Sequence, residues 1–156
     1  MITITVNKII ANSIVITTSP VIKAETHIKF VDGTEGDYLI EGNMSFQKLI
    51  AAGLMPEGSG STQEPSWIKY PAEVEIGSAV TSIGGSYTFY RCPGLTSMVI
   101  SNSVTSIGSS TFNMCYNITS VTFSGKDKAT VQGMSNYRWD LPSGCVLHCT
   151  DGDITL

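Results

Sequence analysis

The sequence predicts a mainly β protein: a small N-terminal β domain with one helix, a linker, a short repeat solenoid and a C-terminal cap. Three observations predict this class. Apolar and polar residues alternate with a period of two at the N-terminus. Ser, Thr, Gly and β-branched residues are abundant, as in β-rich chains. One stretch of the chain also repeats itself at an offset of 23 or 24 residues.

Composition excludes several function classes. Charged residues make up 14% of the 156 residues, and the formal net charge is -4. Nucleic-acid binders gather Lys and Arg on one face, whereas the nine basic residues here are scattered, so we expect no nucleic-acid partner. No apolar run approaches the roughly 18 residues that cross a bilayer, and the N-terminus lacks the pattern of a secretory signal. We therefore expect neither membrane insertion nor classical export.

The N-terminal domain is predicted to span residues 1–55. Alternation over Ile2–Val6 predicts a first strand. Further short strands are expected over 14–18, 21–24, 27–31 and 38–40, with a turn at 7–8 or 11–13 and a loop at 32–36. Apolar residues at helical spacing predict a helix over 46–54, capped by Asn43 or Ser45 and ended by Gly53 and Pro56. The small polar residues and prolines of 56–66 predict a linker.

Internal repetition begins beyond the linker. Residues 74–84 match 98–108 at an offset of 24, and Phe89 and Cys92 reappear as Phe112 and Cys115 at an offset of 23. A single coil cannot bury its own apolar face, so equivalent residues are expected to stack into a core. The expected repeat core comprises Val80, Ile83, Phe89, Cys92, Leu95, Val104, Ile107, Phe112, Cys115 and Ile118. Val99 is expected to stack in the same core, over Thr122 or Phe123.

The period and the pattern Val-x-x-Ile-Gly, Phe, x-x-Cys resemble the BspA-type leucine-rich repeat, or leucine-rich repeat 5, family over about residues 74–124. This resemblance implies a leucine-rich-repeat solenoid, predicted over 67–124, and a role in adhesion. The family usually has Pro where this chain has Gly77 and Ser101. The segment 125–156 is predicted to be a cap, and its tail is similar to caps that follow such repeats in proteins from gut anaerobes and their phages.

Candidate chemical sites have simpler structural explanations. Stacked Cys92 and Cys115 would point in parallel, which disfavours disulfide geometry, so we expect buried thiols. On an extended strand His148 would face away from Cys145 and Cys149, so no metal site is expected. The two histidines lie in different modules, and no nucleophile motif or phosphate-binding loop is present. We therefore expect no enzyme activity and no cofactor.

Exposed aromatic residues are the remaining functional signal. Tyr87, Tyr90, Arg91 and Tyr116 are the candidate contact surface, whereas Tyr137 and Trp139 are expected to pack under the cap. Because a short solenoid leaves apolar ends, we also expect self-association, with a homotrimer as one form, or incorporation into a larger particle.

Together these features predict a non-enzymatic structural or binding protein. The favoured role is a phage virion surface component, such as a capsid decoration, head fibre or tail tip. Its N-terminal domain would attach to the capsid, the tail or itself, and its repeats would meet a host-surface glycan or protein. The alternatives are a bacterial cell-surface adhesin or secreted interaction module, and a carbohydrate-binding accessory domain.

Overall fold

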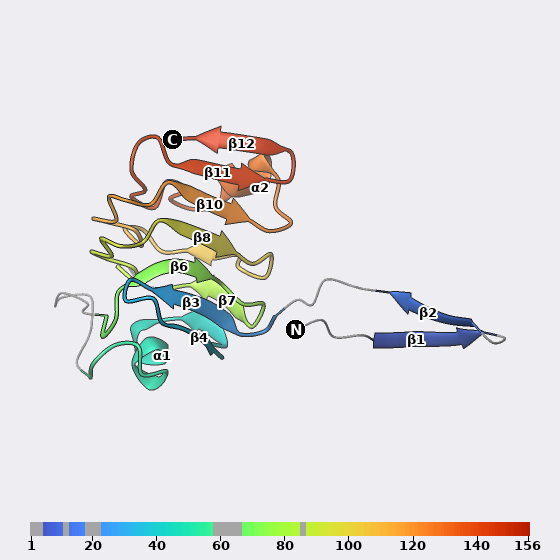
Figure 1. Cartoon of the computed structure of the whole chain (residues 1–156). Coiled ribbons are helices and arrows are strands. Elements are labelled where there is room, and N and C mark those ends of the chain that lie inside the picture. Colours follow the sequence, from blue (N-terminus) through green and yellow to red (C-terminus); the bar gives the residue numbers. More distant parts are fainter. Residues whose placement is uncertain (1–4, 11–12, 18–22, 58–66, 85–86) are drawn as a thin grey trace.

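The computed structural model describes residues 5–10, 13–17, 23–57, 67–84 and 87–156 (Figure 1). In chain order its elements are β1 (Thr5–Ile10), β2 (Ser13–Thr17), β3 (Thr26–Phe30), β4 (Glu35–Tyr38), β5 (Gly42–Met44), α1 (Phe46–Ala51), β6 (Pro71–Glu75), β7 (Val80–Ile83), β8 (Ser97–Ile100), β9 (Ser106–Ile107), β10 (Ser120–Phe123), α2 (Lys128–Gly133), β11 (Val146–Cys149) and β12 (Gly152–Thr155). Over these residues the chain is mainly β, so the predicted fold class is confirmed.

Successive coils stack to form a solenoid. In the seven-stranded sheet the order is β12-β11-β10-β8-β6-β3-β4, and β6, β8, β10 and β11 run parallel. Val74, Met98, Val121 and Leu147 lie in one row across these four strands. A smaller sheet, β5-β7-β9, completes the coils. Each sheet takes one strand from each of its coils, so equivalent repeat positions lie side by side (Figure 1).

The core runs along the solenoid axis. All ten residues of the expected repeat core are between 0% and 3% exposed. The rings of Phe89 and Phe112 stack with centroids 5.9 Å apart, and Trp67 stacks on Phe89 at 5.4 Å. Trp139 packs against Phe123 near the C-terminal end, with centroids 5.6 Å apart. These aromatic side chains join the interiors of successive coils.

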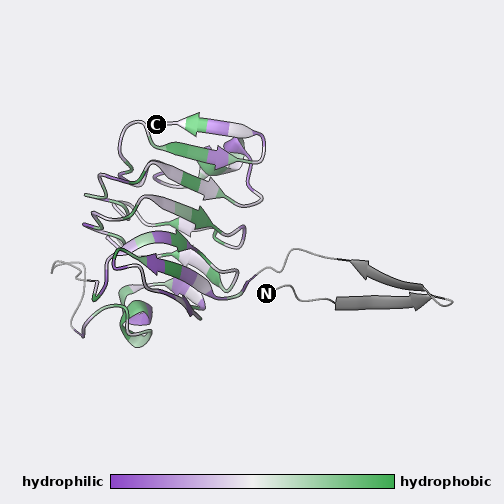
Figure 2. Cartoon of the chain, viewed as in Figure 1, coloured by the Kyte–Doolittle hydropathy of each residue, from purple (hydrophilic) through white to green (hydrophobic). Residues whose placement is uncertain are grey.

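The expected position of Val99 was wrong. Met98 and Ile100 point inward and are 1% and 0% exposed, whereas Val99 is half-buried on the outer face of the sheet, next to Thr122. Successive side chains of a strand point to opposite faces, so only one of the two alternating sets can enter the core. Figure 2 shows the resulting interleaving of apolar and polar residues along the strands.

The described part of the N-terminal region continues the solenoid. β3 pairs antiparallel with β6, and Ile28 lies opposite Val74. Ile40, Met44 and Leu49 belong to the same buried cluster as the repeat core. Residues 23–55 therefore share a sheet and a core with the repeats, and the proposed domain boundaries remain a prediction about independent folding. Most of the predicted linker, residues 58–66, lies outside the described residues.

Several local predictions differ from the structure. The helix predicted over 46–54 ends at Ala51, and its N-cap residue Ser45 makes no side-chain capping hydrogen bond. The strand expected over 38–40 lies instead over Glu35–Tyr38 and takes in part of the expected loop. Helix α2 was not predicted, because its six residues bury only Val131 and so carry little periodic signal. Its N-cap residue, Asp127, accepts a hydrogen bond from the backbone N–H of Thr130 at 2.8 Å.

The first two strands form a separate sheet. β1 and β2 pair antiparallel, with Val6 opposite Ile16 and Ile9 opposite Ile14. Residues 11 and 12 of the turn expected at 11–13, and the start of the first predicted strand, lie outside the described residues. A turn at 7–8 is wrong, because β1 continues through these residues.

Candidate interaction surface

Three stacked loops form one edge of the solenoid, which we call the loop edge. They are residues 87–96, 110–119 and 136–145, and they lead into β8, β10 and β11. The backbone N–H of Arg91 donates to the carbonyl oxygen of Asn113 at 3.0 Å, and that of Phe112 donates to the carbonyl oxygen of Trp139 at 3.1 Å. The loop edge is therefore a continuous surface held by hydrogen bonds between coils.

The loop edge contains a repeated left-handed backbone. Tyr87 and Arg91 have φ values of 74° and 52°, and their equivalents 23 residues later, Ser110 and Met114, have 51° and 62°. In the third loop Asn136, Trp139 and Asp140 are also in this region. A residue other than glycine pays roughly 1–2 kcal/mol for this conformation. The stacked coils thus hold bulky side chains on turns where glycine would be the least strained residue.

Two Tyr–Arg pairs stand on the first and third loops. The Arg91 guanidinium lies 5.9 Å from the centre of the Tyr90 ring, and that of Arg138 lies 5.9 Å from the centre of the Tyr137 ring. Tyr87 meets Tyr90 edge-to-face, with ring centroids 5.1 Å apart. Both arginines are exposed and the three tyrosines are half-buried.

Polar groups lie between the two pairs. The side-chain amide of Asn113 donates to Asp140 Oδ2 at 3.0 Å and so bridges the second and third loops. Next to this bridge is an open cavity of about 310 Å³. Its lining residues are Ser109, Ser110, Asn136, Tyr137, Arg138, Trp139 and Asp140. Trp139 is only 1% exposed, and its indole N–H donates to the carbonyl oxygen of Ser135. Its ring therefore lies behind the cavity surface and offers little area to a ligand.

The structure brings together three of the four predicted contact residues. Tyr87, Tyr90 and Arg91 share the first loop, whereas Tyr116 is in the second loop, where it is 72% exposed and forms no Tyr–Arg pair. Tyr137 is half-buried and packs against the core, as expected, and sequence reasoning did not single out its contact with Arg138. A usable signal was present: the dipeptide Tyr-Arg occurs at both 90–91 and 137–138.

The outer face of the large sheet is a second exposed surface. Figure 1 shows this face uncovered, with α2 behind the sheet. One row across it, read from the strand register, is Asp37, His27, Glu75, Val99, Thr122, His148 and Asp153. At each end of this row a histidine Nδ1 lies 2.8 Å from an aspartate Oδ1. The hydrogen bond with His27 lowers the pKa of Asp37, so this carboxylate stays charged. Glu75 is a further acidic residue of the row, and Val99 and Thr122 are its uncharged members.

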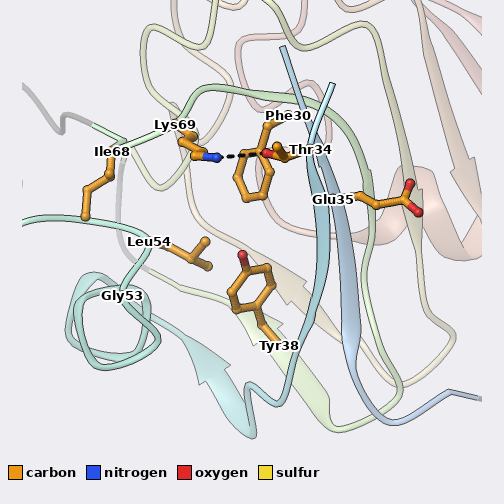
Figure 3. Close-up of a pocket in the computed structure, with 8 residues that line it drawn as sticks. All are labelled: Phe30, Thr34, Glu35, Tyr38, Gly53, Leu54, Ile68 and Lys69. Atoms are coloured by element: carbon orange, nitrogen blue, oxygen red, sulfur yellow. Dashed lines mark hydrogen bonds between the residues drawn. The ribbon is translucent and has the colours of Figure 1, made fainter. Parts of the chain in front are cut away.

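A small pocket lies at the N-terminal end of the solenoid (Figure 3). Its volume is about 230 Å³, and its lining residues are Phe30, Thr34, Glu35, Tyr38, Gly53, Leu54, Ile68 and Lys69. The Lys69 ammonium donates to Thr34 Oγ1 at 2.9 Å and lies 2.9 Å from Asp32 Oδ2. Hydrogen bonds from Thr34 and Lys69 lower the pKa of Asp32 to about 2, so this carboxylate stays charged and balances Lys69.

The cysteines are free thiols. Cys115 Sγ donates to the carbonyl oxygen of Phe89 at 2.8 Å, and burial raises the pKa of its neighbour Cys92. Burial also raises the pKa of Cys145 to about 11, which keeps this thiol protonated. His148 pairs with Asp153, and among the described residues no group of three or more His, Cys, Asp or Glu side chains could hold a metal ion.

These features define a short parallel-β solenoid built from repeats. Residues 69–137 match the family model described as "BspA type Leucine rich repeat region (6 copies)", so the repeat region of this chain is similar to that family. This confirms the resemblance in the repeat region, while the likeness of the C-terminal cap remains a prediction. Comparisons with curated proteins and with solved structures found no match.

The family indicates a repeat-based module for protein binding or adhesion, and such repeats are typically non-enzymatic and often found on surfaces or outside cells. In the ranges that the structure describes, no helix is long and apolar enough to span a bilayer.

Proposed function

We propose that this chain is a non-enzymatic surface component of a phage particle, attached through its N-terminal end and displaying its repeats for adhesion. The distribution of exposed apolar side chains carries the proposal. Among the described residues six large hydrophobic side chains are exposed. Four of them, Val31, Leu39, Ile68 and Tyr70, belong to the N-terminal end of the solenoid. Exposed apolar patches mark surfaces that meet other proteins.

The separate hairpin supports attachment at the same end. β1 and β2 precede β3 in the chain and pair only with each other. A two-stranded hairpin by itself is marginally stable in water, so it gains stability from a partner surface. That partner is the particle or further copies of this chain, such as the other two chains of a homotrimer.

Display in many copies suits so short a repeat module. A few coils offer a small contact surface, and the affinity of one copy for a host molecule is correspondingly weak. Linking many copies on one particle turns later contacts into intramolecular ones and raises the overall avidity by orders of magnitude. The outer sheet face and the loop edge are the surfaces available for these contacts.

Mass spectrometry of purified phage particles and of washed cell envelopes from the source culture tests the proposal. We expect the chain in particles at a fixed ratio to the major structural proteins. A particle preparation from a phage that encodes the chain without residues 1–22 should lack it, while the remaining solenoid is still made. Recovery only from envelopes would refute the virion role and favour a bacterial surface adhesin.

A further inference from the structure

The large sheet has an open edge at β4. This strand is the last one at the N-terminal end of the sheet, and over the part of the chain that the structure describes no strand lies beyond it. The backbone N–H of Phe30 donates to the carbonyl oxygen of Thr34 at 2.8 Å, where β3 and β4 meet. Bonded and non-bonded pairs alternate along an antiparallel ladder, so Glu35 and Asp37 point their backbone N–H and C=O groups away from β3. Such a row of main-chain groups can pair with a further strand.

The pocket of Figure 3 lies beside this edge. Tyr38 of β4 and Leu54, in the turn after α1, point toward each other across it (Figure 3). Its volume of about 230 Å³ is below the roughly 300–1,000 Å³ of sites for drug-sized molecules, so it has room for a single side chain. A residue that pairs with Gly36 from an added strand would point to this side of the sheet, since Ile28, opposite Gly36, is buried there. Its side chain would meet that of Tyr38, which lies 3.0 Å from a Cβ built on Gly36.

The pocket combines apolar walls with polar groups. The Lys69 ammonium has three N–H groups, and it lies 2.9 Å from Thr34 Oγ1 and 2.9 Å from Asp32 Oδ2, so one N–H can donate to a further acceptor. A side chain with an apolar body and a hydroxyl at its tip, as in tyrosine, matches this combination. The apolar side chains that line the pocket are Phe30, Tyr38, Leu54 and Ile68.

The side chains of β4 on the outer face of the sheet are acidic. Asp37 lies 2.8 Å from His27 Nδ1 and 3.7 Å from Lys23, whereas the Glu35 carboxylate, 60% exposed, lies 3.7 Å from His27 Nε2. Like charges directly opposite each other on neighbouring strands are destabilising, and opposite charges are stabilising. A strand that pairs with β4 therefore has a basic or uncharged residue, rather than an acidic one, opposite Glu35.

We propose that an extended segment of a particle protein pairs with the open edge of β4 and inserts a tyrosine-like side chain into the pocket between β4 and the turn after α1. Main-chain hydrogen bonds give such strand addition its affinity, and the pocket gives it specificity. The other edge strand, β12, lies in residues 125–156, which contain no exposed large hydrophobic side chain, whereas four such side chains surround the β4 end. This inference rests on the proposed attachment through the N-terminal end and names the chemistry of the partner.

Nuclear magnetic resonance titration of the full chain with a cyclic β-hairpin peptide, one strand of which reads Thr-Lys-Tyr-Lys-Thr, tests the inference. Cyclisation holds the strand extended and so lowers the entropy lost on binding. We expect a Kd below about 1 mM, with the largest shift changes at the amides of Glu35 and Asp37. The same peptide with Ser in place of its Tyr should bind about fivefold or more weakly, because the pocket then stays empty.

Proline variants separate the β4 edge from general effects. Glu35→Pro removes an outward N–H, whereas Glu35→Ala removes the same carboxylate and keeps the N–H, so E35P should bind the peptide about threefold or more weakly than E35A. Thr155→Pro is the matched control at the β12 edge and should bind within about twofold of wild type. The N–H of Thr155 also points outward, because its neighbour Leu156 donates to the carbonyl oxygen of Cys145.

Circular dichroism checks that each variant is folded. If E35P is unfolded, Ile68→Gln in the pocket lining takes its place and should bind about threefold or more weakly, with Val31→Gln as the control outside the pocket. Both side chains are 61% exposed, so neither change disturbs the core.

Three outcomes would overturn the inference: no shift changes up to about 5 mM peptide, equal binding by E35P and E35A, or shift changes confined to β12. Sedimentation of the two Glu35 variants should be alike, and self-association kept by E35A but lost in E35P would make a second copy of this chain the occupant instead. Particle proteomics tests the virion role separately. A titration that fails while the chain is present in particles would refute this site alone.

Discussion

The stacked aromatic rings offer the sharpest test of how the solenoid is held together, and Phe89→Ala is the perturbation of choice. Phe89 is 0% exposed and stacks on two rings, with centroids 5.4 Å from Trp67 and 5.9 Å from Phe112. Truncating a buried Phe to Ala costs about 3–5 kcal/mol, because transfer free energy is lost and a cavity remains. The loss of both ring contacts places Phe89→Ala at the upper end of this range, about 4–5 kcal/mol.

A second variant tests whether the loss of stability grows with the number of ring contacts that are removed. Phe112→Ala also creates a buried cavity, but Phe112 stacks on Phe89 alone among the ring contacts described, so it should cost roughly 1 kcal/mol less than Phe89→Ala. Tyr116→Ala is the control, because this side chain is 72% exposed, and its effect should stay within about 0.5 kcal/mol.

Urea unfolding followed by far-ultraviolet circular dichroism measures these differences. A loss of about 4 kcal/mol is a large share of the roughly 5–15 kcal/mol that stabilises a typical domain, and it lowers Tm by on the order of 10–15 °C for a chain of this size. A loss below about 1 kcal/mol for Phe89→Ala, or a larger loss for Phe112→Ala than for Phe89→Ala, would refute the reasoning.

Three further predictions concern backbone space, charge and thiol chemistry. Gly77→Ala should destabilise the chain by about 2–3 kcal/mol in urea unfolding, since its Cβ would overlap backbone carbonyls of the segment entering β3. Gly133→Ala, with nothing within 4 Å of the new Cβ, should be neutral or stabilising by up to about 1 kcal/mol, and equal losses in the two variants would contradict this. The pKa of Asp32 is held at about 2, below its ordinary 3.8, so its contribution to stability is present above pH 4 or so and is lost as the pH falls toward 2. The urea midpoint should therefore drop less between about pH 5 and pH 2.5 in Asp32→Asn than in wild type, and an equal drop would argue against the paired carboxylate. Finally, a thiol reagent such as DTNB should modify half-buried Cys149 before the three buried cysteines, and Cys149→Ser should remove the fast phase; a fast phase that persists would show another thiol to be accessible.

The repeat region could be predicted from the order of residues alone. Equivalent residues such as Ile83 and Ile107, or Phe89 and Phe112, could be placed side by side because each coil of a solenoid contacts mainly its neighbours. The spacing of the repeat therefore predicts which residues touch in the folded chain, and the core residues were predicted from this spacing. The candidate contact residues Tyr87, Tyr90 and Arg91 were chosen in the same way, as positions outside the repeating apolar pattern, and their role stays a prediction.

The features that break the period could not be predicted from the order of residues. The pairing of Ile28 with Val74 joins β3 to the repeat sheet, yet nothing near either residue specifies so distant a partner. Arg138 could not be assigned to the loop edge, because the third loop departs from the spacing of the first two. Its place depends on left-handed turns and on hydrogen bonds between coils, which exist only once the coils have stacked. Contacts that repeat can be read from the order of residues, whereas contacts made once depend on the folded chain.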